Sequence, residues 1–232
     1  MSREYQPGQG SAIEDAAKRL AGDIFTDEPF DFDEQSNGLL KWMVRVAADG
    51  LKARIPEGVD HQGVLDSLVG ILAQAPNEDA HMIAEMHLLA SIQAMYEHGC
   101  GSLLLDLRGW EDMDLGYLTA SAERPLALQA SGEFGEFGEG VAHCDMTLVG
   151  TARRVGTKAR SSVFHLKPSE DTEIGSYAMD CVFYLSGTRS QVRQMLADSF
   201  AYGEYDDDEA MHQFLGSNEV YYRRGGSWKR WT

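Results

Sequence analysis

Apolar residues and glycines recur in one order three times between Phe137 and Gly187. Each repeat opens with an apolar residue before a glycine, and Gly138, Gly156 and Gly175 are 18 and 19 residues apart. Large apolar residues follow each glycine at offsets of eight and ten, namely Met146, Phe164 and Phe183, then Leu148, Leu166 and Leu185. A fixed period of this length predicts stacked structural repeats.

Alternation inside each repeat predicts a strand, because successive side chains of a strand point to opposite faces. In residues 181–185 the even offsets from the glycine are apolar, and a Gly or Pro after each strand supplies a turn. The pattern favours a parallel β-solenoid, in which each coil buries its inward residues against its neighbours. An antiparallel sheet or sandwich with regular strand spacing is the alternative.

The strand pattern extends backward to residues 103–109 and 126–132. About five coils are therefore expected within 101–187, ending at Gly109, Gly132, Gly150, Pro168 and Gly187. The first of these steps is longer than the others, which predicts an insertion of four or five residues near 123–125. Phe164 and Phe183 are expected to be buried neighbours on adjacent coils.

The segment from Ile174 to Gly187 resembles the glycine-repeat right-handed β-helix found in the C-terminal domain of glutamate synthase and in one of the subunits of formylmethanofuran dehydrogenase. The resemblance covers residues 103–187. Ala159 and Ala178 depart from it, because the family tends to repeat a second glycine at these positions. The resemblance implies a scaffold that spaces catalytic parts located elsewhere, and it assigns no catalytic residue to this chain.

Residues 1–100 have helical periodicity, which makes the predicted fold class α+β. Helices are expected from Ser11 to Ile24, over 37–55, over 61–75 and over 77–98. Residues 1–10 form a loose arm and 26–35 an acidic loop in this interpretation. Residues 188–232 are predicted to form a helix over 190–200 and a hairpin that turns at Gly225-Gly226. The helices before Gly101 and the segment after Gly187 should cover the two ends of the solenoid, whose strand edges would otherwise be unpaired.

A formal charge of −17 argues against a surface that binds free DNA. No apolar run is long enough for a membrane span and no leader pattern is present. We therefore expect a soluble, cytoplasmic protein that does not associate with a membrane. Cys100, Cys144 and Cys181 lack metal-type spacing and are expected to be reduced, the last two in one inward column two coils apart.

No catalytic or metal motif stands out. His81 and Glu85 share a helix face near His87 and His98, but a core stripe on this helix is the favoured interpretation. The glycines of 132–140 could cradle phosphate, but three glutamates lie among them, so a solenoid turn is preferred. The carboxylates of 206–209 are expected to precede a helix rather than to bind a divalent ion. We predict no cofactor and no metal.

Three groups of residues are candidate binding sites. A basic cluster over 151–160 contains no acid and could bind a carboxylate or phosphate, although pairing with the protein's own glutamates is favoured. An outward strip of the last coils is apolar and aromatic and should be covered. The basic, aromatic tail has the composition of contact hot spots. Their members are Arg153, Arg154, Lys158 and Arg160; Val163, His165, Val182 and Tyr184; and Arg223, Arg224, Trp228 and Trp231.

These patterns leave three functional hypotheses. The first is a non-catalytic scaffold or interaction protein that assembles with itself or with a partner protein. The second is an enzyme or enzyme subunit whose polar groups meet in three dimensions, with His143, His165, Tyr184 and Arg154 as candidates. The third is an acidic factor that docks on a ribonucleoprotein through its basic aromatic tail.

Overall fold

The computed structural model describes residues 9–21, 37–75, 78–110, 112–167, 169, 172–175, 177–200 and 207–231. Most of the expected N-terminal arm, the acidic loop over 26–35, Pro168 and Asp206 lie outside the described residues. The chain divides into two compact units, Met1–Leu103 and Leu104–Thr232. Each unit is described by itself. The finer division at residues 100 and 187 stays a prediction, as does the covering of the first coil by the helices.

The first unit contains the four helices that the periodicity predicts, with ends within a few residues of those expected. They are α1 (Gln9–Ala21), α2 (Asn37–Lys52), α3 (His61–Leu72) and α4 (Glu78–Glu97). α1 packs against α3 and α2 against α4, and leucines such as Leu20, Leu65 and Leu88 are fully buried between them. In the described part of the chain no helix is long and apolar enough to cross a membrane.

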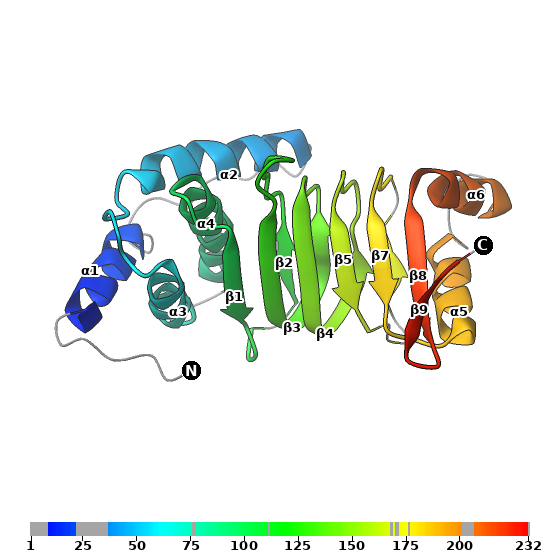
Figure 1. The fold of residues 1–232 in the computed structure, drawn as a ribbon. Helices are drawn as coiled ribbons and strands as arrows, with labels where there is room; N and C mark the ends of the chain where they lie inside the picture. Colours follow the sequence, from blue (N-terminus) through cyan, green and yellow to red (C-terminus); the bar gives the residue numbers. More distant parts are fainter. Residues whose placement is uncertain are drawn as a thin grey trace. The chain divides into compact units, whose positions relative to one another are not determined.

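The second unit is a parallel β-solenoid of about four turns, followed by two helices and a hairpin (Figure 1). One face carries the strand order β1-β3-β4-β5-β7-β8-β9, and β2 and β6 pair with the second halves of β3 and β4 on the next face. The strands are β1 (Ser102–Asp106), β2 (Met113–Gly116), β3 (Leu126–Glu139), β4 (Cys144–Val155), β5 (Val163–Leu166), β6 (Glu173–Ile174), β7 (Val182–Leu185), β8 (Glu219–Arg224) and β9 (Ser227–Arg230).

The pairing register confirms the sequence period. Phe137 lies opposite Val155, which lies opposite Ile174, so the ladder advances by 18 and then 19 residues. The expected insertion is an exposed turn closed by a bridge between Ser121 and Arg124. The strand pattern occurs five times but yields only about four turns. The fifth occurrence, β7, leads into a helix instead of completing its coil.

Glycine is required where the coil bends. Gly132 and Gly150 are paired on neighbouring coils, and a Cβ on Gly150 would lie 1.9 Å from the carbonyl oxygen of Gly132. The interpretation of 132–140 as a turn needs a correction. Residues 133–139 continue β3 on the second face, since glycines allow the bend at Gly132 without ending the strand.

The inward side chains form columns along the coils. Phe164 and Phe183 are fully buried and stacked, with ring centroids 5.0 Å apart, as predicted. Cys144 and Cys181 are buried free thiols in one column, with Ser162 between them. The hydroxyl of Ser162 accepts a hydrogen bond from the Cys144 backbone N–H at 3.1 Å, so this inward polar group is satisfied.

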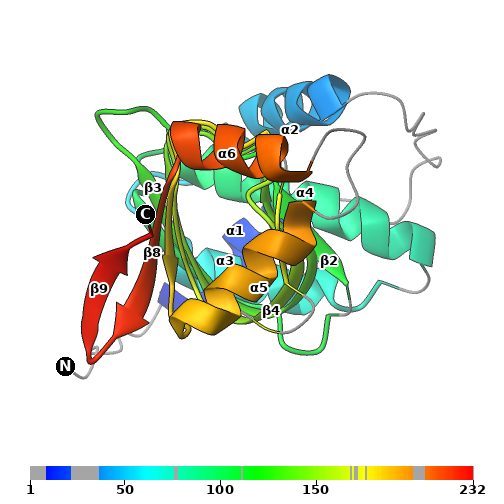
Figure 2. The same cartoon turned by 90° about the vertical axis from the view of Figure 1, so that its right-hand side faces the viewer.

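Two helices close the C-terminal end of the solenoid, one near the expected range 190–200 and one where the carboxylates of 206–209 were expected to precede a helix. α5 (Arg189–Phe200) and α6 (Asp207–Ser217) lie across the coil in Figure 2. The Phe214 ring of α6 contacts Phe183 at 5.5 Å, and the Ser199 hydroxyl of α5 accepts a hydrogen bond from the Ile174 N–H at 2.7 Å. The described residues of α5 and α6 therefore pack on the end of the coil, and the hairpin extends the sheet beyond β7. The covering of every strand edge at this end stays a prediction.

Candidate functional site

A column of stacked rings runs along the outer side of the last strands. His165 on β5 stacks on Tyr184 of β7, with centroids 4.8 Å apart and planes 6° from parallel. Tyr184 stacks in turn on Tyr221 of β8, at 5.0 Å and 19°. The column forms because these three residues lie directly opposite one another in the parallel register. Trp228 of β9 meets Tyr184 edge-on at 5.1 Å. We call His165, Tyr184, Tyr221 and Trp228 the aromatic strip.

Polar groups at both ends of the column fix its rings. The imidazole Nε2 of His165 lies 3.3 Å from a carboxylate oxygen of Asp145. The Tyr221 hydroxyl donates to the carboxylate of Glu219 at 2.7 Å, and this hydrogen bond raises the pKa of Tyr221. The rings of the strip are therefore held in place by contacts within the chain itself.

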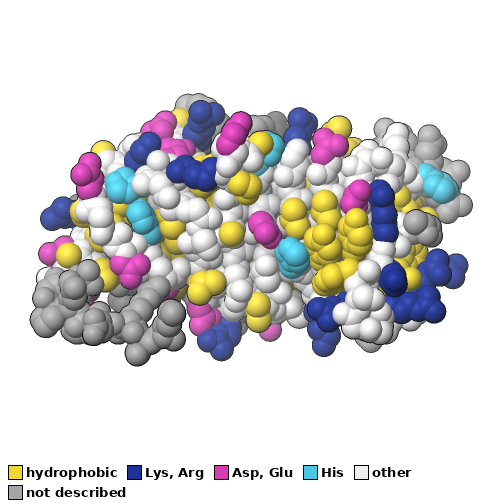
Figure 3. Space-filling model, in the orientation of Figure 1, with side chains coloured by type: hydrophobic (Ala, Val, Ile, Leu, Met, Phe, Trp, Pro, Cys, Tyr) yellow, Lys and Arg dark blue, Asp and Glu magenta, His cyan; other side chains and the backbone are white. Residues whose placement is uncertain are grey.

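The aromatic strip is only partly covered in the isolated chain. All four of its members are half-buried, and so are the outward residues Val163 and Val182 beside them. The sequence predicted cover for Val163, His165, Val182 and Tyr184 by the chain's own terminal segment or by a partner. The terminal hairpin supplies part of it through Trp228. Figure 3 shows the remaining hydrophobic side chains gathered over β5, β7 and β8.

The hairpin that borders the strip carries several cationic side chains of its own. Arg223 lies over the Trp228 ring at 5.0 Å, and Arg230 pairs with Glu219 at 3.1 Å. Arg224 and Lys229 are exposed beside them. Trp231 lies elsewhere, against Tyr222 at 6.0 Å and under Arg189 at 5.4 Å. The predicted tail residues thus divide, with Arg223 and Trp228 at the strip and Trp231 packed near the start of α5.

The basic cluster over 151–160 lies on the next face of the solenoid and contacts carboxylates of the same chain. Arg153 pairs with Asp112, and Arg154 pairs with the buried carboxylate of Glu136. The ammonium group of Lys158 lies 3.8 Å from Glu139. This arrangement agrees with the favoured interpretation, internal pairing. Arg160 contributes backbone bridges to the neighbouring coils, and its predicted binding role is untested.

Burial perturbs the acids of this face. Desolvation raises the pKa of Glu136, although Arg154 and the Thr157 hydroxyl, which donates to Glu136 at 3.0 Å, oppose the shift. Desolvation also raises the pKa of Asp114, against a hydrogen bond of 2.8 Å from the Glu136 N–H. The hydroxyl of Tyr117 donates to Glu139, and burial together with this contact raises the pKa of Tyr117. The face is a network of satisfied charges.

A hollow of about 510 Å³ opens beside this network. It is lined by Asp112, Asp114, Gly135, Glu136, Arg153, Arg154 and Glu173. The four residues suggested for an enzyme do not meet there. Arg154 lines the hollow, whereas His165 and Tyr184 lie on the strip face of β5 and β7, and His143 lies before β4. Within the described ranges, no group of three or more His, Cys, Asp or Glu side chains could hold a metal ion.

The histidines of the helical unit have structural contacts. His87 lies 2.5 Å from the carbonyl oxygen of Leu20 at the end of α1, and burial lowers the pKa of His87. His98 lies 3.0 Å from His61, nitrogen to nitrogen, and burial together with His98 lowers the pKa of His61. These contacts join helices to one another, and among the described residues the structure does not gather the histidines with Glu85 into a metal site.

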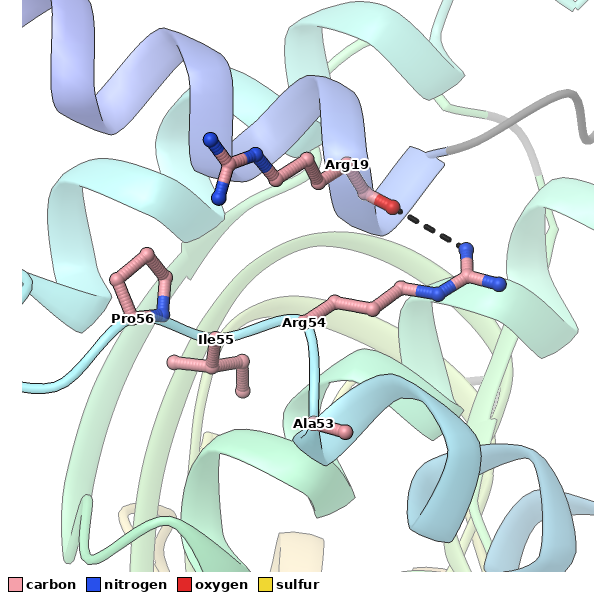
Figure 4. A pocket seen from close by; sticks show the side chains of 5 residues that line it. All are labelled: Arg19, Ala53, Arg54, Ile55 and Pro56. Carbon is pink, nitrogen blue, oxygen red and sulfur yellow. Dashed lines mark hydrogen bonds between the residues drawn. The ribbon is translucent and has the colours of Figure 1, made fainter.

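A second hollow, of about 440 Å³, lies in the helical unit and is lined by Arg19, Ala53, Arg54, Ile55 and Pro56. Figure 4 shows the two guanidinium groups pointing apart. Arg54 donates to the carbonyl oxygen of Arg19 at 3.2 Å, near the C-terminus of α1. Because the guanidinium groups do not converge, the hollow offers no clamp for an anion.

Comparison with protein-family models, curated proteins and solved structures finds no match to this chain. The resemblance of residues 103–187 to the glutamate synthase family therefore stays a prediction.

Sequence reasoning missed Tyr221, the third ring of the column. A signal was present, because Asn218, Val220 and Tyr222 repeat the inward pattern of Cys181, Phe183 and Leu185 at a distance of 37 residues. That distance is the sum of the two repeat steps, 18 and 19. The side chain of Asn218 accepts from the Cys181 N–H at 2.9 Å, as Ser162 does two coils earlier for Cys144. α5 and α6 interrupt the repeat without changing its phase.

Proposed function

We propose that this chain is a non-catalytic interaction protein that binds a partner protein through the outer face of β5, β7, β8 and β9. The observation that carries the proposal is the half-exposed aromatic strip. Four rings in contact with one another form a preorganised surface of large area, and aromatic residues beside arginine are enriched at the centres of protein interfaces.

The charged network of the neighbouring face supports the enzyme hypothesis less well. Its cations neutralise its own carboxylates, and the polar residues suggested for catalysis are divided between two faces. The solenoid acts in this proposal as a rigid scaffold that orders the strip. The scaffold role needs no catalytic residue on this chain.

Ring orientation favours a protein over a nucleic acid. A single-stranded nucleic acid binds by stacking its bases on free aromatic faces. In the column the two faces of Tyr184 are occupied by His165 and Tyr221, and Arg223 lies over the Trp228 ring. Ring edges and hydroxyl groups remain for contact, and these suit the side chains and backbone of a protein. Docking of the hairpin on a ribonucleoprotein becomes an alternative outcome of the experiments below.

Val182→Glu tests the proposal, because Val182 is an outward residue beside the strip. The variant and the wild type are purified from the source organism and compared by native mass spectrometry and thermal unfolding. We expect the fold to persist and the bound partner to be lost. The new carboxylate would lie beside Glu219, its neighbour in the pairing register, so a small loss of stability is expected from like charges.

Ala127→Glu is the matched control. Ala127 belongs to the same outward column and lies opposite Asp145, so this variant also places two carboxylates side by side, but two strands before Val163 and outside the strip. It should retain the partner. The proposal is wrong if both variants keep the partner or both lose it. If Val182→Glu unfolds while Ala127→Glu does not, the surface is an internal contact instead.

A further inference from the structure

The sheet of the strip ends at β9, and the hydrogen bonds of the hairpin reveal which backbone groups face outward. On the side of β7, the N–H groups of Glu219 and Arg223 donate to the carbonyls of Cys181 and Gly187, which flank that strand, at 2.9 and 3.2 Å. Val220, between them, accepts from the Trp231 N–H at 2.7 Å on the other side. Odd-numbered residues of β8 therefore bond to β7 and even-numbered residues to β9.

The register of the hairpin extends this alternation to β9. Trp231 is opposite Val220, and Tyr222 is opposite Lys229, so residues 227, 229 and 231 turn their backbone groups toward β8. The N–H and C=O groups of Trp228 and Arg230 consequently point away from β8. Among the residues that the structure describes, no strand pairs with this outer edge of β9. Figure 2 shows the β8–β9 hairpin projecting from the coil.

The outward backbone groups belong to residues of the strip face. Trp228 is opposite Arg223 and Arg230 is opposite Tyr221, so their side chains lie on the outer side of the sheet. A strand added at this edge would place alternate side chains next to Trp228 and Arg230 while its backbone bonded to theirs. Affinity would come from the main chain and specificity from the neighbouring side chains.

The positive charge of the hairpin favours an acidic strand at this edge over a second copy of the chain. Arg223, Arg224, Lys229 and Arg230 all lie within the hairpin segment 223–230, whereas the whole chain has a net charge of −17. A second copy that paired edge to edge would bring Lys229 and Arg230 close to the same residues of the first, which repels. A strand with carboxylates at alternate positions would instead meet cations.

From this placement we propose that β9 is an acceptor edge for an extended acidic segment of a partner protein, which adds to the sheet as a tenth strand. The inference rests on the proposed function and names how the partner binds. It assigns the backbone of Trp228 and Arg230 as the pairing groups, with the cations of the hairpin as the source of selectivity.

Nuclear magnetic resonance of the full chain tests the inference with peptides as probes. An alternating Glu-Val peptide is added up to about 1 mM, enough to half-saturate a site with a millimolar dissociation constant. We expect the amide signals of Trp228 and Arg230 to shift saturably and to gain protection from hydrogen exchange. An alternating Lys-Val peptide should shift neither amide.

Two substitutions at one position separate backbone pairing from charge. Arg230→Gln removes the cation and keeps the N–H, so the dissociation constant should rise by up to about fivefold, as expected for an exposed ion pair. Arg230→Pro removes the outward N–H as well, at a position whose N–H does not bond to β8. It should weaken binding by about tenfold more.

Several outcomes would overturn the inference. Absence of binding up to about 1 mM, equal binding of the lysine peptide, or equal affinities of the two Arg230 variants contradicts acidic strand addition. Oligothymidylate that shifts the same two amides would identify a nucleic acid as the occupant. Peptide shifts confined to the rings of His165 and Tyr184 would contradict strand addition and leave the proposed function standing. If Arg230→Pro disrupts the hairpin, the wild type supplies the test of backbone pairing. The Trp228 and Arg230 amides must then gain protection from hydrogen exchange when the acidic peptide binds, and unchanged protection would contradict strand addition.

Discussion

Two ring stacks occupy adjacent positions on the same pair of strands and have different surroundings. Phe164 and Phe183 stack inside the coil with centroids 5.0 Å apart, and His165 and Tyr184 stack outside it at 4.8 Å. The inner stack is fully buried and continues to Phe214 of α6. The outer stack is half-buried and continues to Tyr221. Parallel register alone therefore aligns rings on both sides of a strand. The two stacks differ in how deeply their rings are buried.

The inner stack stabilises the fold, because its rings exchange water for close-packed neighbours. The outer stack keeps its polar edges in contact with water. Its rings gain modest cross-strand energy and remain available to a partner. We expect substitutions of the inner rings to act on folding and substitutions of the outer rings to act mainly on association.

The largest expected effect belongs to the inner stack. Phe183→Ala removes a ring that contacts both Phe164 and Phe214, and the cavity should lower the free energy of unfolding by about 3–5 kcal/mol. Urea unfolding followed by circular dichroism measures the change. A loss below about 1 kcal/mol would contradict the inward register.

The outer stack should tolerate the same truncation better. Tyr184→Ala loses two stacking contacts at a half-exposed position, and we expect the free energy of unfolding to fall by about 1–2 kcal/mol. The measurement is the same urea titration. A loss as large as that of Phe183→Ala would mean that the aromatic strip is a structural element, and the contrast between the two stacks would disappear.

The smallest effect is expected on the neighbouring charged face. Desolvation raises the pKa of Glu136 in the folded chain. The contribution of this carboxyl group to stability is therefore fully present below about pH 4.5. It is lost as the pH rises through the raised pKa, because the buried group then becomes charged. Glu136→Gln removes this loss. At pH 7 the free energy of unfolding should change by less than about 1 kcal/mol, and unfolding should depend less on pH above about pH 4.5.

Partner binding supplies the control for this variant. Glu136→Gln should leave the partner bound, since the charged face lies outside the proposed interface. A steeper dependence of stability on pH in this variant would contradict the raised pKa of Glu136. Release of the partner would show that the charged face belongs to the interface.

The solenoid and its inward columns could be predicted from sequence because both repeat with a fixed period. Phe164 and Phe183 share an offset from their glycines, and so do His165 and Tyr184, which made both ring pairs predictable. The helices were predictable from apolar periodicity, with ends near Pro56 and Gly99. Local pattern and stacking agree in these regions.

Long-range contacts of the site were not predictable in the same way. The pairing of β8 with β7 crosses two helices, so no local pattern places Tyr221 on Tyr184. The contact of Trp228 with Tyr184 depends in addition on the position of the hairpin. The network of Asp114, Tyr117 and Glu136 joins residues from different coils, and its altered pKa values arise from burial that only the folded chain provides.

Hydroxyl-radical footprinting tests most directly whether the aromatic strip is an interface. Oxidation of His165, Tyr184, Tyr221 and Trp228 is measured in protein purified from its source and in the chain produced alone, with Tyr177, which is 72% exposed, as the internal reference. We predict slower oxidation of all four strip residues in the protein from its source and equal oxidation of Tyr177. Equal rates at the strip in both preparations would contradict the account.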